Sequence, residues 1–113
     1  IVHEDAGNAS VLRLQGQVLG GDETEYLTTV LQDLADRRRP VILDMSNVSY
    51  VNSSFLSSLL AAHTHAVRRG TGLMVTELRP PVSDIIELTR MHQVLGIHDT
   101  VDAALKATSN SIT

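Results

Sequence analysis

An apolar run at residues 41–45, in which Asp44 is the one charged residue, constrains the fold most strongly. A strand that is apolar on both of its sides needs cover on both faces of its sheet, as the central strands of parallel sheets have. Pro40 precedes the run, and a serine-rich segment follows it. The run therefore predicts a buried central strand in a domain where strands and helices alternate.

Strand-like and helix-like segments do alternate along the rest of the chain. Apolar residues predict further strands at residues 10–15 and 73–76. Helical spacing and capping residues predict four helices, at residues 22–39, at residues 53–69, from Pro80 onward and from Asp99 or Thr100 onward. Gly20 and Gly21 predict a turn. Because the connections are short and the chain has 113 residues, we expect one compact domain.

Composition narrows the range of partners and compartments. The net charge of −4 argues against a nucleic-acid partner, and the absence of Cys excludes disulfides and thiol chemistry. No apolar run approaches the length of a membrane span. We see no secretory signal, although the chain begins at Ile1 without an initiator Met, which leaves the true N-terminus open. The absence of Cys and the net charge suit the cytoplasm, and we expect a cytoplasmic protein.

The segment at residues 51–56 predicts a helix that begins at a cluster of serines. Asn52 fits the N-cap position, where its side-chain oxygen accepts a backbone N–H two or three residues later. The free N–H groups and the helix dipole favour negative charge at this end, so the fold would tolerate a phosphate on Ser53 or Ser54. Asn and Ser are also ordinary capping residues, an interpretation that requires no function.

The same helix is expected to have two unlike faces, given about 100° of rotation per residue. The stripe expected to face the sheet consists of Leu56, Leu59, Leu60, His63 and Val67. The opposite, small-residue face consists of Ser54, Ser57, Ser58, Ala61 and His65, and another protein could lie closely on it. Phe55 falls on the flank: an exposed ring would anchor a partner, whereas a buried ring would pack on the sheet.

Catalytic and metal chemistry find no support in the sequence. The nucleophile elbow Gly-x-Ser-x-Gly is absent. The glycines at residues 70 and 72 lack the spacing and the Lys of a phosphate-binding loop. His63 and His65 are two residues apart, so one helix directs them to nearly opposite sides. We therefore expect a non-enzyme without catalytic residues, cofactor or metal.

Residues 41–56, read as Val-Ile-Leu-Asp-Met-Ser-Asn-Val-Ser-Tyr-Val-Asn-Ser-Ser-Phe-Leu, resemble the signature of the STAS family, the sulphate-transporter and anti-sigma-factor-antagonist domain. The family pattern is an apolar strand, Asp-Leu-Ser, a short loop and Asp-Ser-Ser-Gly-Leu. The resemblance continues through residues 86–89 and 99–105 and covers residues 11–107. It implies a single α/β STAS-like domain, with a central mixed sheet and about four helices packed mainly on one face.

The resemblance also implies a function. In that family the first Ser of the Asp-Ser-Ser-Gly motif is phosphorylated by a partner kinase, and this position is Ser53 here, with Ser54 as the alternative. The strand-end Asp of the family falls on Asp44, which we expect to support the switch site. The implied protein is a stand-alone anti-sigma factor antagonist. It binds an anti-sigma factor that is a serine kinase, frees a sigma factor, and is switched off by phosphorylation, which a PP2C-type phosphatase would reverse.

The expected partner-binding residues surround this serine: Asn52, Ser53, Ser54, Phe55, Ser57, Ser58 and Ala61. Two of them depart from the family pattern, because Asn52 replaces Asp and Phe55 replaces Gly. These departures favour an alternative, a STAS scaffold that is never phosphorylated and belongs to a stressosome-like or transporter complex. The sequence leaves the oligomeric state open.

Overall fold

The structure, a computed structural model, describes residues 2–7, 9–18 and 22–110, and the predicted turn at Gly20 and Gly21 lies outside them. One sheet contains five strands in the order β1-β2-β3-β4-β5. The strands are β1 (Val2–Asp5), β2 (Ser10–Val18), β3 (Val41–Val51), β4 (Leu73–Thr76) and β5 (Gly96–His98). β1 runs antiparallel to β2 and the other neighbours are parallel, so the sheet is mixed, as predicted.

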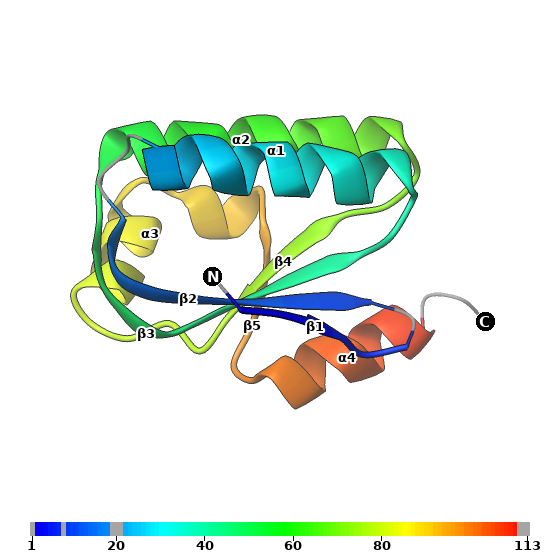
Figure 1. The fold of residues 1–113 in the computed structure, drawn as a ribbon. Coiled ribbons are helices and arrows are strands. Elements are labelled where there is room, and N and C mark those ends of the chain that lie inside the picture. Colours follow the sequence, from blue (N-terminus) through cyan, green and yellow to red (C-terminus); the bar gives the residue numbers. More distant parts are fainter. Residues whose placement is uncertain (1, 8, 19–21, 111–113) are drawn as a thin grey trace.

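Helices cover both faces of the sheet, most of them on one face (Figure 1). The helices are α1 (Asp22–Asp36), α2 (Ser53–Arg68), α3 (Val82–Leu88) and α4 (Val101–Asn110), and the short 3-10 helix η1 (Met91–Gln93) follows α3. From β2 to β5 each new strand is added on the same side of the preceding one. Connections between parallel strands are right-handed almost without exception, so the connecting helices α1, α2 and α3 lie on the same face. No helix within the described ranges is long and apolar enough to cross a membrane.

Alternating side chains of β3 supply two separate cores. Leu43 and Met45 belong to the larger one, beneath α1, α2 and α3. Ile42 points the other way, into a smaller core that Ala104 of α4 completes. This arrangement explains why the run at residues 41–45 is apolar on both sides.

Several element boundaries differ from the sequence prediction. β3 extends to Val51, where a loop was expected after residue 45, because two register shifts against β2 each insert an extra residue into β3 and let pairing continue. The short strands β1 and β5 were not predicted. α1 ends at Asp36, three residues earlier than expected.

The ends of α1 and α2 use the same backbone conformation with different residues. α2 is followed by Gly70 at φ 83°, and α1 is followed by Arg38 at φ 57°. At the end of α1 the N–H of Arg38 donates to Ala35 at 2.8 Å, and the N–H of Arg39 donates to Leu34 at 2.9 Å. Glycine adopts this left-handed conformation freely, whereas for other residues it costs about 1–2 kcal/mol. Arg38 therefore stands where backbone stability alone would favour glycine.

Candidate functional site

The start of α2 is capped as the sequence predicts. Asn52 lies in an extended conformation, and its Oδ1 accepts the N–H of Phe55 at 3.0 Å. The carbonyl oxygen of Asn52 accepts the N–H of Leu56 at 3.1 Å. Ser53 is thus the first helical residue, immediately beyond the carboxyl end of β3.

Most of the predicted partner-binding residues lie together on the outer surface of α2. Ser53, Ser54, Ser57 and Ala61 are exposed, and Asn52 and Ser58 are half-buried. The Ser58 hydroxyl donates to the carbonyl oxygen of Ser54 at 3.0 Å. The Ser53 hydroxyl has no hydrogen-bond partner within the described parts of the chain, so it is open to solvent and to an approaching protein.

The ring of Phe55 is buried, which decides between the two alternatives for it and contradicts its expected place among the partner-binding residues. Its side chain is 0% exposed and packs in the larger core, so it cannot contact a partner from this position. The buried stripe of α2 consists of Phe55, Leu56, Leu59, Ala62 and Ala66. Its centre is rotated by roughly 60° from the predicted stripe, at about 100° per residue. Leu60 and Val67, both expected to face the sheet, are 39% and 55% exposed.

The rotation has a physical cause. An aromatic ring carries more apolar area than a leucine, so burying Phe55 removes more surface from water than burying Leu60 would. The small residues Ala62 and Ala66, two and three turns further along the same side, let α2 approach the sheet closely. As a result, Ser53, Ser57, Leu60 and Thr64 lie on the outer side of α2, where they recur at helical spacing and are all exposed. We call these four residues the ridge.

The ridge begins at an electropositive helix end. The first-turn N–H groups of Ser53 and Ser54 have no acceptor within the helix. The first turn of α2 contains no acidic residue. A phosphate on Ser53 would therefore meet the positive end of the helix dipole without a competing carboxylate from the same turn.

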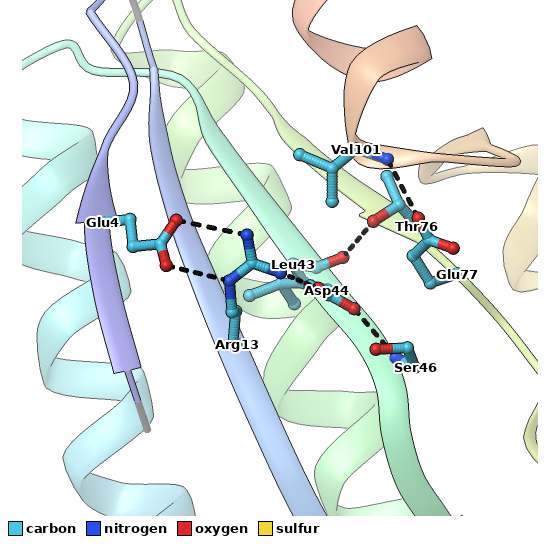
Figure 2. A network of polar contacts seen from close by, with 8 residues as sticks. All are labelled: Glu4, Arg13, Leu43, Asp44, Ser46, Thr76, Glu77 and Val101. Atoms are coloured by element: carbon cyan, nitrogen blue, oxygen red, sulfur yellow. Dashed lines mark hydrogen bonds and ion pairs between the residues drawn. The ribbon is translucent and has the colours of Figure 1, made fainter.

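Asp44 lies on the other face of the sheet, in a polar network that joins three strands (Figure 2). Its carboxylate is nearly buried, and Oδ2 is 2.5 Å from Nη1 of Arg13 while Oδ1 accepts the N–H of Ser46 at 2.9 Å. Arg13 also forms a two-pronged pair with Glu4, at 3.1 and 3.2 Å. Hydrogen bonding to Arg13 lowers the pKa of Glu4 below its ordinary value.

This network shows Asp44 in a structural role and does not join it to the serines. Neither Arg13 nor Ser46 belongs to α2, and β3 alternation directs Asp44 away from the core beneath that helix. Its support of the switch site stays a prediction. Across the described ranges, no group of three or more His, Asp or Glu side chains is placed to hold a metal ion.

Comparison with known proteins identifies the family. The family model of the STAS domain matches residues 1–104. This chain belongs to the STAS domain family. A relative from Paenibacillus polymyxa, named anti-sigma F factor antagonist, is 24% identical over 98 residues, which are 84% of this chain and 82% of the relative.

Solved STAS structures share the fold. An anti-sigma factor antagonist from Mycobacterium paratuberculosis is 24% identical, with a TM-score of 0.83 over 96% of this chain and 92% of that one. The Bacillus cell fate determinant SpoIIAA in its phosphorylated form is 13% identical, with a TM-score of 0.72 over 94% of this chain and 96% of that one. At these identities the likeness shows the STAS fold alone.

The cap offers a first test within this STAS domain. Asn52→Ala should lower the free energy of unfolding by about 1 kcal/mol, because the N–H of Phe55 loses its side-chain acceptor. Asn52→Asp keeps an acceptor and should preserve stability. Urea denaturation measures both, with Ser54→Ala as an exposed control expected within about 0.5 kcal/mol of the parent. Equal losses for Asn52→Ala and Ser54→Ala would show that the cap contributes nothing.

Proposed function

We propose that this STAS domain is an anti-sigma factor antagonist whose binding is switched off by phosphorylation of Ser53. The observation that carries the proposal is the exposed Ser53 at the first position of a capped helix. Family membership and the name of the Paenibacillus polymyxa relative support the same function. The proposed partner is an anti-sigma factor that is itself a serine kinase, and the proposed compartment is the cytoplasm.

The switch acts through surface chemistry. A phosphate adds nearly two negative charges and three acceptor oxygens at Ser53. In the free protein the amino end of α2 stabilises those charges, so the fold need not change. Against a packed partner the same charges must be desolvated, and any acidic group across the contact repels them. Phosphorylation would therefore end binding, and a PP2C-type phosphatase would restore it.

The ridge of α2 supplies the proposed contact surface. Its small residues Ser53 and Ser57, and Ala61 beside the ridge, let a partner approach closely. Leu60 is a large, part-exposed apolar side chain within the ridge. Apolar anchors surrounded by small or polar residues often carry much of the energy of an interface. Since Phe55 is in the core, Leu60 replaces it as the proposed anchor.

Leu60→Ala tests this surface. Binding to the anti-sigma factor, measured by calorimetric titration with purified partner, should weaken about tenfold, or ~1.4 kcal/mol. Leu88→Ala is the matched control, because Leu88 is 83% exposed on α3 and lies outside the ridge. Equal affinities for Leu60→Ala and the parent would show that the partner does not use the ridge.

A further inference from the structure

A cavity of about 680 Å³ opens at the end of the sheet remote from Ser53. Gly96 and Leu73, the first residues of β5 and β4, line it, whereas Ser53 lies two residues after Val51, the last residue of β3. Its volume lies within the range of ordinary small-molecule sites. None of the described residues that line it is Asp or Glu. The described lining of this cavity is thus free of acidic side chains, in a protein of net charge −4.

Three of the residues that line this cavity come from different segments, and each carries a hydrogen-bond donor that lacks a partner among the described residues. Arg38 contributes a guanidinium group that forms no ion pair with any described residue, unlike its neighbours Arg37 and Arg39. Nδ1 of His63 accepts the N–H of Leu73 at 3.4 Å. In the neutral ring this leaves Nε2 as the donor, and Nε2 has no partner among the described residues. The buried Oγ1 of Thr71 has no hydrogen-bond partner either.

Arg38 has an unfavourable backbone conformation and Thr71 has an unfavourable unpaired hydroxyl, and a bound ligand would offset both costs. Arg38 adopts a left-handed backbone conformation at φ 57°, which glycine would adopt without strain. An unpaired buried hydroxyl is also unfavourable, and such groups are uncommon in folded proteins. Strained and unsatisfied residues gathered in one cavity are characteristic of ligand sites.

We propose that this cavity binds a small organic phosphate. Arg38, the Nε2–H of His63 and the Thr71 hydroxyl would donate to the three terminal phosphate oxygens, with Thr71 turning about χ1 toward the ligand. A Cβ built at Gly70 or at Gly72 meets no atom within 4 Å, so the backbone leaves room for the phosphate beside Thr71. The apolar wall formed by residues such as Leu73 and Met74 would take the organic part.

The probes are phenyl phosphate, inorganic phosphate and benzoate, titrated into the full chain and followed by amide chemical shifts. We expect phenyl phosphate to bind most tightly, with the largest shifts at Gly70, Thr71 and Gly72. Arg38→Gly should weaken its binding at least tenfold. Arg90→Gly is the matched control, because Arg90 has the same left-handed backbone at φ 59° and does not line the cavity; its affinity should equal that of the parent.

Thr71→Val separates ligand binding from stability, because a hydroxyl with only a structural role would not change the affinity for phenyl phosphate. This variant should bind phenyl phosphate several-fold more weakly and melt no lower than the parent, since it loses a hydroxyl without a partner. Thr71→Ser should keep the affinity. No binding of phenyl phosphate, or equal loss in Arg38→Gly and Arg90→Gly, would overturn the proposal. Benzoate binding as tightly as phenyl phosphate would overturn the assignment of a phosphate.

Discussion

Phe55→Ala is expected to lower the free energy of unfolding by about 3–5 kcal/mol. The ring is fully buried in the larger core, where its loss removes apolar contact and leaves a cavity beneath α2. A domain of this kind has a total stability on the order of 5–15 kcal/mol, so the variant would lose a large fraction of it. Phe55→Gly should cost still more, although it restores the residue of the family pattern, because glycine also weakens the helix.

Urea denaturation of Phe55→Ala and Leu60→Ala measures the effect and supplies its control. Leu60 is 39% exposed, so its truncation leaves a smaller void and should cost well under half as much. The pair therefore reports which side of α2 faces the sheet. If Leu60→Ala were the more damaging of the two, the orientation of α2 described above would be wrong.

A phosphate on Ser53 is expected to weaken binding to the anti-sigma factor about a hundredfold, or ~2.7 kcal/mol. The exposed hydroxyl stands at the start of the ridge, so its two added charges would enter the proposed contact. The first turn of α2 contains no acidic residue, so in the free protein the helix end stabilises the phosphate and the fold tolerates it.

Calorimetric titration of the phosphorylated and unphosphorylated forms measures this difference. Ser53→Ala should bind as the unphosphorylated form does, and Ser53→Asp should fall between the two forms, because a carboxylate carries less charge than a phosphate. Melting curves of both forms should nearly coincide, since the fold is expected to tolerate the phosphate. Equal affinities of the two forms would contradict a switch at Ser53.

Much of the fold could be predicted because local pattern and global structure agree. The apolar run at residues 41–45 is apolar on both sides because it lies between two cores, and α2 begins where Asn52 can cap it. The strands β1 and β5 were missed because both are short and each contains a single apolar residue besides glycine, whereas β4, which is as short as β1, is mostly apolar. The length of β3 depends on register shifts against β2, a tertiary feature with no local signal.

The orientation of α2 shows where periodicity alone fails. Phe55 and Leu60 flank Leu56 and Leu59 on opposite sides, so the pattern permits two stripes that share Leu56 and Leu59. Burial of the ring decides between them, and this depends on the space beneath the helix, which no sequence pattern reports.

The ion pair between Arg13 and Asp44 could have been predicted from the sequence. Arg13 interrupts the apolar segment of β2 much as Asp44 interrupts the run in β3, and the charges are opposite. A charge is costly in a buried strand unless it is paired, so two lone opposite charges on neighbouring strands suggest a partner for each. They are register partners in the sheet and form the ion pair. Glu4 could not be found this way, because β1 itself was not predicted.

The central claim is most directly tested by locating the phosphate. The protein and its Ser53→Ala variant are incubated with ATP and the purified anti-sigma kinase, and labelled peptides are mapped by mass spectrometry. We expect one phosphate, on Ser53, and no labelling of Ser53→Ala. Undiminished labelling of Ser53→Ala, or no labelling by a kinase that binds the chain, would contradict it and favour an unphosphorylated STAS scaffold.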